Sequence, residues 1–350
     1  MDCAPHDFQY PSTRYSGSKR RFLGWILENI GSLEFDSVLD VFGGTGSVSL
    51  MFKRYGKEVL YNDLLKCNQL IGTAIVENDN VKVTEEDIAK VVEFTQDEYP
   101  DFIQREFRGI FFTDDENLWL DRIIANISRV ENQYKRAIFM ASLFQACLAK
   151  RPFNLFHRAN LYLRLNEVPR TFGNKTTWER PFPELFGRYI TEYNRAVFSN
   201  DKRNRVIGGF DAINSPNGVD LVYLDPPYFS GDASQGTNYL AFYHFLEGLS
   251  DYKRWAEGSS LLYGKTKRIP DNEAIQRFTK KDKVLVSFAQ LLERFQDSTI
   301  VLSYQDEGIP SREEILCILR GLGKKVEVFE KPHRYALSRR KRTELLFVAT

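Results

Sequence analysis

The chain has 350 residues, 43% hydrophobic and 27% charged, and its 48 basic residues nearly balance 47 acidic ones. This composition is typical of a globular protein, and the length allows one large domain with an insertion, or two domains. No apolar stretch is long enough to cross a membrane and the N-terminus lacks the features of a signal peptide, so we expect a cytoplasmic protein with no membrane contact.

The first part of the chain predicts a β–loop–α–β unit. Its elements are expected at residues 21–30 (helix), 37–42 (strand), 48–55 (helix) and 58–61 (strand). The loop Gly43-Gly44-Thr45-Gly46 joins the first strand to a helix, and glycines there let a ligand approach the backbone, although a plain tight turn would use them too. Asp63 follows the second strand, where it could bind ribose hydroxyls or cap the next helix.

The middle of the chain predicts an inserted region. Residues 64–150 are mostly helical by pattern, with long apolar stripes over 117–128 and 134–148. From residue 151 to residue 205 there are eleven Lys or Arg against five Asp or Glu, interleaved with aromatic and amide side chains. A solvated basic surface would show the same charge, but the interleaving favours nucleic acid. We predict a recognition region over 64–199, with its nucleic-acid-facing part near 151–185.

The rest of the chain alternates strands and helices, which predicts a parallel, doubly wound sheet. Strands are expected at residues 205–208, 219–224, 298–304 and 325–330, and helices at 284–295 and 312–322. Residues 343–348 are expected to form an edge strand or a hairpin partner. Residues 1–63 and 200–350 would then form one domain around the insertion.

The strand at 219–224 runs into Asp225-Pro226-Pro227-Tyr228. Prolines have no N–H group and cannot continue a strand ladder, so their segment leaves carbonyl oxygens free to accept hydrogen bonds. The carboxylate is a further acceptor and the tyrosine ring offers a flat face. These groups suit a planar base with an exocyclic amine, although a strand-ending turn in which Asp225 caps a helix would use the same residues.

The glycine loop and Asp63 together predict a nucleoside pocket. The loop lacks the Lys-Ser/Thr ending of a P-loop, and its spacing differs from the dinucleotide fingerprint. S-adenosylmethionine, which contains adenosine and no phosphate, therefore fits better than ATP or NAD.

These motifs together resemble a known family. Asp40-x-Phe42-x-Gly44-x-Gly46, then Asp63, then the Asp225 tetrapeptide resemble the S-adenosylmethionine-dependent amino-methyltransferases of DNA. Residues 14–19, Arg-Tyr-Ser-Gly-Ser-Lys, resemble the Lys-Trp-Ala-Gly-Gly-Lys element of the adenine enzymes, with Arg-Tyr in place of Lys-Trp. The order of the elements is that of the alpha group, which is mainly specific for adenine N6, and the resemblance extends to residues 151–162 and 343–347.

The resemblance implies a Rossmann-like, doubly wound α/β methyltransferase sheet with an inserted, largely helical DNA target-recognition region. It implies catalysis by Asp225, Pro226, Pro227 and Tyr228. It implies S-adenosylmethionine contacts from Tyr15, Lys19, Asp40, Phe42, Gly43, Gly44, Gly46, Asp63, Phe210, Asp211 and Asp225, with Tyr15 and Lys19 at the methionine end. Phe210 could instead be a core residue beside a turn aspartate. Predicted DNA contacts are Arg151, Asn154, His157, Arg158, Asn160, Tyr162 and Arg164.

Two features have other interpretations. The aromatic stretch 239–248 could be a mobile loop that closes on an extruded base, or a helix packed on the core. His157 and His244 have no second ligand at metal spacing, and the cysteines show no Cys-x-x-Cys pair, so we expect no metal and regard both histidines as polar contacts.

The expected activity is site-specific methylation of a flipped-out adenine in double-stranded DNA, as the modification enzyme of a restriction–modification system. A separate cognate restriction endonuclease is a candidate partner, and we expect a monomer. The alternatives are a cytosine-N4 methyltransferase, where Ser-Pro-Pro-Tyr is more usual, a non-catalytic DNA-binding protein on the same fold, and methylation of RNA or of protein glutamine, where Asn-Pro-Pro-Tyr is usual.

Overall fold

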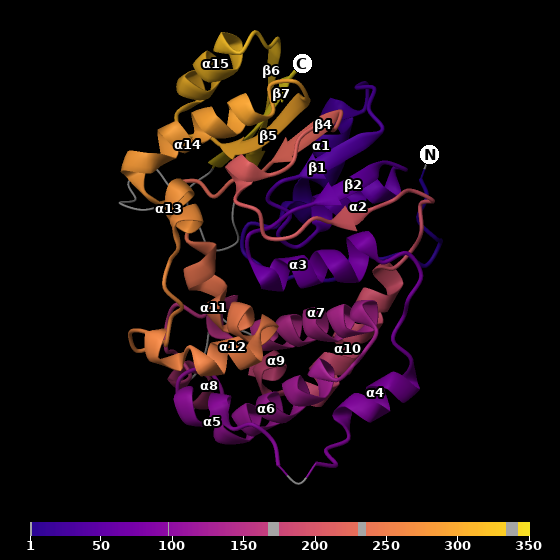
Figure 1. Ribbon diagram of the computed structural model, residues 1–350, viewed down its shortest axis with the longest axis vertical. Coiled ribbons are helices and arrows are strands. Elements are labelled where there is room, and N and C mark those ends of the chain that lie inside the picture. The colour runs from indigo at the N-terminus through magenta and orange to yellow at the C-terminus, as the bar shows by residue number, and fades with distance from the viewer. Residues whose placement is uncertain (1, 97, 167–174, 230–235, 334–341) are drawn as a thin grey trace.

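A β-sheet at one end of the molecule and a thick layer of helices at the other make up the structure (Figure 1). The computed structural model describes residues 2–96, 98–166, 175–229, 236–333 and 342–350. No helix in these ranges combines the length and apolar character that a membrane span requires.

The seven-stranded sheet has the order β3-β2-β1-β4-β5-β7-β6. Its strands are β1 (Ser37–Asp40), β2 (Glu58–Tyr61), β3 (Arg205–Val206), β4 (Leu221–Leu224), β5 (Thr299–Gln305), β6 (Val326–His333) and β7 (Arg342–Ala349). The first five strands are parallel, and β7 is antiparallel to both of its neighbours. The α/β prediction is confirmed, with a mixed rather than fully parallel sheet.

The last strand does not lie at the sheet edge. β7 pairs with β6 as a hairpin and also lies against β5. Its run Leu345–Ala349 is buried on both faces, which an interior position provides and an edge position does not. Of the two expectations for residues 343–348, the hairpin partner is confirmed and the edge strand is wrong.

Alternate residues of each strand face two separate cores. One core holds Leu221 and Tyr223 of β4 and extends into the helical layer. The other holds Val222 and Leu224 and is closed by helices beyond the opposite face. The helices next to the sheet are η1 (Lys19–Phe22), α1 (Leu23–Ile30), α2 (Ser47–Arg54), α3 (Lys66–Gly72), η2 (Thr73–Glu77), η4 (Ala212–Asn214), α13 (Glu273–Thr279), α14 (Lys281–Arg294) and α15 (Arg312–Gly321).

The helical layer is built around α7, which is buried without interruption from Ala137 to Ala149. Its members are α4 (Glu85–Val92), α5 (Phe102–Glu106), α6 (Asp114–Ser128), α7 (Gln133–Ala149), η3 (Pro152–Asn154), α8 (Tyr162–Leu165), α9 (Lys175–Glu179), α10 (Phe182–Ala196), α11 (Tyr239–Ser250), α12 (Tyr252–Glu257) and η5 (Ser259–Leu261). A helix hydrophobic on every side needs neighbours on every side, and Figure 1 shows α7 among α3, α10, α11 and α6.

Two α-helices of this layer, together with η5, come from far along the chain. α11 and α12 follow β4 in sequence, yet α11 packs beside α3 and α7 (Figure 1). The Glu247 carboxylate of α11 accepts hydrogen bonds of 3.0 Å from the backbone amides of Lys66 and Cys67, at the start of α3. The predicted division of the chain into a catalytic domain (1–63 and 200–350) and a recognition region (64–199) stays a prediction. In space, residues 239–257 lie with the helical layer, although they fall in the predicted catalytic domain.

Candidate active site

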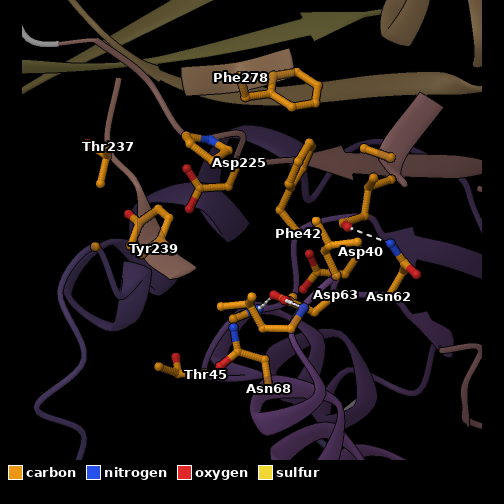
Figure 2. Close-up of a pocket in the computed structure, with 18 of the residues that line it drawn as sticks. Asp40, Phe42, Thr45, Asn62, Asp63, Asn68, Asp225, Thr237, Tyr239 and Phe278 are labelled. Carbon is orange, nitrogen blue, oxygen red and sulfur yellow. Dashed lines mark hydrogen bonds between the residues drawn. The ribbon is translucent and has the colours of Figure 1, made fainter. Parts of the chain in front are cut away.

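A pocket opens where β1, β2 and β4 end. The chain runs outward from β1 through β2 to β3 and then returns to β4 on the other side of β1. Such a reversal leaves a crevice at the carboxyl ends of the strands, which is where open α/β sheets bind ligands. The pocket encloses about 960 Å³, counting its open mouth. Figure 2 shows Asp40, Asp63 and Asp225, from three different strand ends, around this one space.

The pocket contains nearly all the residues predicted to hold a cofactor. It is lined by Tyr15, Lys19, Asp40, Phe42, Gly43, Gly44, Asp63, Phe210, Asp211 and Asp225. Of that predicted set only Gly46 is not among the lining residues; it supplies instead the left-handed N-cap of α2, with φ 68°. Their roles as cofactor contacts stay a prediction.

The glycine loop follows the surface of the Tyr61 ring. A Cβ on Gly43 would lie 2.1 Å from a Tyr61 ring carbon, so no larger residue fits there. The Tyr61 hydroxyl donates to the Gly44 carbonyl at 2.8 Å, and Gly44 has φ 52°. The loop is therefore a tight turn that also forms one wall of the pocket.

Asp63 braces this loop and the turn that leads into the next helix. Its two carboxylate oxygens accept from the backbone amides of Gly44 at 2.9 Å and Leu65 at 2.8 Å. Burial raises the pKa of Asp63 to about 6, against these two hydrogen bonds. Helix α3 begins at Lys66 with Leu65 as its N-cap and has no side-chain cap, so the capping interpretation of Asp63 is wrong. Asp63 instead lines the pocket and fixes the turn before the helix.

Asn62 places the Phe210 segment at the pocket. The Asn62 side chain donates to the carbonyls of Val41 and Phe210, at 3.0 and 3.1 Å, and accepts from the Phe210 amide. Phe210 is 44% exposed, so it is not a core residue. Asp211 pairs with Arg277 at 2.8 Å. Asn62 was not among the predicted residues, although its position directly before Asp63 is a usable signal.

Asp40 is the most deeply buried of the pocket carboxylates. It is 1% exposed, one oxygen accepts from the Ser49 hydroxyl at 2.6 Å, and the other has no partner among the described residues. Burial raises the pKa of Asp40 to about 7, and the charges of Asp225 and Asp63 add to the effect. An uncompensated buried acceptor of this kind favours a ligand that brings a donor or a positive charge.

The N-terminal segment is held by stacked tyrosines. The Tyr15 ring stacks on Tyr243 at 3.9 Å between centroids and on Tyr239 at 5.7 Å. Asn68 donates to the Tyr15 hydroxyl at 3.1 Å, and the Ser16 amide donates to the Tyr243 hydroxyl at 2.6 Å. Residues 239–250 form helix α11, so the packed-helix interpretation is confirmed and the mobile-loop interpretation is not. Tyr239, which was not predicted as a site residue, also lines the pocket.

Lys19 lies beside the predicted catalytic carboxylate. Its Nζ is 2.8 Å from Asp225 Oδ1 and 3.0 Å from Glu344 Oε1, and 5.5 Å from the centre of the Tyr228 ring. Burial alone would lower the pKa of Lys19, but the nearby acidic groups raise it well above its usual value. Glu344 was not predicted, although a charge directly before the apolar run 345–348 is unusual and indicates a buried partner.

Two residues of the tetrapeptide, Asp225 and Pro227, line the pocket, whereas Pro226 is buried and Tyr228 is not among the lining residues. Asp225 is partly exposed, and no hydrogen bond or ion pair within the described ranges uses its Oδ2 or the Pro226 carbonyl. Pro227 lines the pocket, and Tyr228 packs edge-on against Tyr304 at 5.6 Å. Burial raises the pKa of Asp225 to about 6, although the Lys19 charge opposes it.

Three of the predicted DNA contacts are corrected by the structure. Arg151 is fully buried and donates to the carbonyls of Phe111 and Leu155 at 3.2 to 3.3 Å. Asn160 is buried against Arg151. The Arg164 side chain is 6% exposed and forms a two-pronged pair with Glu116. All three hold the segment together internally, so they are not available to DNA in this structure.

The other predicted DNA residues lie nearer the surface. Arg158 and Tyr162 are exposed, Tyr162 by 58%, while Asn154 and His157 are half-buried. His157 lies beside Phe242, and the buried His244 ring bonds the Phe156 carbonyl at 3.1 Å. No cluster of three metal-binding side chains occurs in the described part of the chain. Residues 167–174, within the predicted DNA-facing segment, lie outside the described residues.

Comparison with known proteins gives one family and several relatives. Residues 15–315 match the family described as D12 class N6 adenine-specific DNA methyltransferase. The type II methyltransferase M2.HphI of Haemophilus parahaemolyticus is 29% identical over 97% of this chain and 98% of its own length. M.FokI of Planomicrobium okeanokoites is 26% identical over 94% of this chain but 50% of its own length. M.CviAII of Paramecium bursaria Chlorella virus 1 is 23% identical over 91% of each.

Replacing Asp40 by asparagine should stabilise the ligand-free fold at neutral pH. With its pKa raised to about 7, Asp40 stays protonated in the folded chain while its unfolded counterpart ionises near 4, so its ionisation lowers wild-type stability as pH rises between these values. The Asp40→Asn advantage in unfolding free energy should grow from about pH 4 to 7, reach about 2–4 kcal/mol, and then level off. Urea unfolding at several pH values measures it; a difference independent of pH would contradict the assignment.

Proposed function

The chain belongs to the family of D12 class N6 adenine-specific DNA methyltransferases, and we propose that its pocket holds S-adenosylmethionine and presents an adenine amine to it beside Asp225. The observation that supports this most strongly is Asp225 itself, a carboxylate that lines the pocket and whose Oδ2 is uncommitted in the described structure.

The acidic and aromatic side chains of the pocket fit this cofactor. Bound S-adenosylmethionine supplies an electrophilic methyl group on a positively charged sulfur, together with an α-ammonium group. Asp40 offers an unpartnered buried oxygen, and burial raises the pKa of Asp40, Asp63 and Asp225 alike. Burial disfavours the ionised form of these three carboxylates, and a cationic ligand would stabilise that form. Phe42 and the exposed ring of Phe210 offer flat apolar surfaces for adenine.

The residues at the mouth would activate the target amine. An adenine inside a duplex cannot reach the pocket, so it must rotate out of the stack at a cost of a few kcal/mol. Asp225 Oδ2 and the Pro226 carbonyl would each accept one N–H of its amine. Those bonds pull the nitrogen lone pair out of conjugation with the ring and aim it into the pocket.

This arrangement favours the transition state over the bound substrate. As positive charge develops on the nitrogen, its attraction to the Asp225 carboxylate grows. Tyr228 would stack on the extruded ring and offset part of the unstacking cost. The remaining requirement is alignment for direct transfer, in which the N–CH3 bond would form as the CH3–S bond breaks. S-adenosylhomocysteine would leave, and the proton lost from N6 would pass to solvent.

The protein's biological setting is proposed from its relatives. M2.HphI is called a type II methyltransferase and the StsI relative of Streptococcus sanguinis a modification methylase. We therefore propose that this chain is the modification enzyme of a restriction–modification system, with a separate cognate endonuclease, acting in the cytoplasm as a monomer. Cytosine-N4 methylation is disfavoured by the family match; nucleoside analysis of methylated DNA separates the two.

Asp225→Ala should reduce the single-turnover methylation rate by about 10²–10³-fold or more, because it removes the acceptor that strengthens in the transition state. DNA binding should remain within a few-fold, and S-adenosylmethionine binding should weaken far less than the rate falls. Asp282→Ala, an exposed aspartate on α14, is the matched control and should turn over normally. Near-normal turnover by Asp225→Ala would contradict the assignment.

Cofactor binding should depend on pH with a definite sign. Asp40, Asp63 and Asp225 ionise with raised pKa values of about 6 to 7. Since their ionised forms attract a cation, the affinity for S-adenosylmethionine should rise between about pH 5 and 8, and more than the affinity for uncharged-sulfur S-adenosylhomocysteine. Calorimetry on both ligands measures this; equal pH dependence would show that the carboxylates do not sense the sulfonium.

Arg158→Ala should weaken DNA binding and reduce the slope of log K against log salt by about 1, because an exposed arginine of the predicted DNA face would release one counterion equivalent. Arg164→Ala serves as contrast. It breaks the buried pair with Glu116, so it should lower thermal stability and leave the salt slope unchanged. The reverse pattern would place the DNA face elsewhere.

A further inference from the structure

Three neighbouring strands bring polar side chains to one point beside Lys19. Asp225 directly follows β4 and continues the alternation of Leu221 and Tyr223, which face the first core. On β5, Val301 faces that same core, and Ser303 follows it two residues later, on the same face of the strand. On β7, Leu346 and Val348 face it too, so Glu344 does as well.

The contacts at this point are short and buried. Lys19 Nζ lies between Asp225 Oδ1 at 2.8 Å and Glu344 Oε1 at 3.0 Å. The Ser303 hydroxyl donates to the same Glu344 oxygen at 2.7 Å. Glu344 is fully buried, and its second oxygen has no partner among the described residues.

Burying the Glu344 carboxylate costs more free energy than burying an uncharged side chain in the same space. Desolvation of a carboxylate is compensated only in part by one ammonium and one hydroxyl, and an uncharged residue in its place would relieve the strain on the fold. The glutamate therefore points to a role that a neutral residue would not supply.

The role follows from the charge count. Lys19 paired with Asp225 alone would form a neutral couple, in which the carboxylate is a weaker acceptor. With Glu344 sharing the ammonium, the three groups together carry one net negative charge. Because Lys19 occupies Oδ1, it also fixes the carboxylate so that Oδ2 is the oxygen left for a donor.

We propose that Glu344 is a positioning residue of the methyl transfer, which anchors Lys19 so that Asp225 keeps both its orientation and its full acceptor strength toward the adenine amine. The inference rests on the proposed function, since it needs Asp225 to contact the base. Glu344 does not touch the substrate and acts only through Lys19.

The electrostatics of Asp225 give the proposal a distinct signature. The charged and titratable groups around it are Lys19 from η1, Glu344 from β7, Asp40 from β1 and Tyr223 from β4. Burial raises the pKa of Asp225, Lys19 lowers it, and Glu344 raises it again. Removing the Glu344 charge therefore lowers the pKa of Asp225, and the acid limb of the rate profile should move to lower pH.

The test compares Glu344→Gln with the wild-type chain in single-turnover methylation of duplex DNA, between about pH 5 and 8.5. Glutamine keeps the shape and the oxygen that Ser303 and Lys19 bind, but removes the charge. We expect the rate at the plateau to fall about tenfold or more, the acid limb to shift downward, and the dissociation constants for S-adenosylmethionine and DNA to change less than about threefold. Glu327→Gln, the same change at an exposed site on β6, should behave as wild type.

Ser303→Ala is a second variant, which removes the hydrogen bond on Glu344 but keeps its charge. We expect a smaller fall in rate with the acid limb in place. The proposal is overturned if Glu344→Gln matches Glu327→Gln in rate and pH profile, or if its only defect is a loss of thermal stability with parallel loss of both ligands. Should Glu344→Gln not fold, a wild-type rate in Ser303→Ala overturns it. Failure of the wild-type chain to methylate adenine would instead contradict the proposed function.

Discussion

Burial of carboxylates at the ends of parallel strands is the physical constraint on which this site depends. β1 ends in Asp40, and Asp63 and Asp225 follow the ends of β2 and β4 beside the same pocket. Each aspartate is only partly compensated: Asp40 by Ser49, Asp63 by two backbone amides, and Asp225 by Lys19. A desolvated anion needs a positive partner. The fold thus leaves buried carboxylates without full compensation of their charge at the place where a sulfonium and an amine would meet.

The helical layer and the pocket are both held by helix α11. Helix α11 bonds the Phe156 backbone through the Phe242 carbonyl at 2.9 Å and through His244. One residue away, Tyr243 has non-helical dihedral angles and holds the N-terminal segment by the Ser16 amide. A segment rich in basic and aromatic residues is therefore fixed to the same helix as the pocket wall, so that a base delivered by the one would arrive at a defined place in the other.

Much of the sheet and the pocket could be predicted from sequence because local patterns determine them. The strand at Glu58–Tyr61 was predicted with its observed limits, because strands and glycine loops follow from residues that are close together in the sequence. Whether a charged side chain is buried depends on residues that are distant in the sequence, and the predictions for such side chains failed. Arg151 and Arg164 contribute to a basic composition, but their guanidinium groups point inward to carbonyls and to Glu116. Glu344 was missed because its partner stands more than 300 residues earlier.

The most direct test of the central claim is the structure of a complex with duplex DNA and an unreactive sulfonium analogue of the cofactor. The account predicts that the extruded adenine N6 lies within hydrogen-bond distance of Asp225 Oδ2 and the Pro226 carbonyl, with Lys19 still on Oδ1. An adenine amine held by other groups, or an Asp225 side chain turned away from the sulfonium, would contradict it.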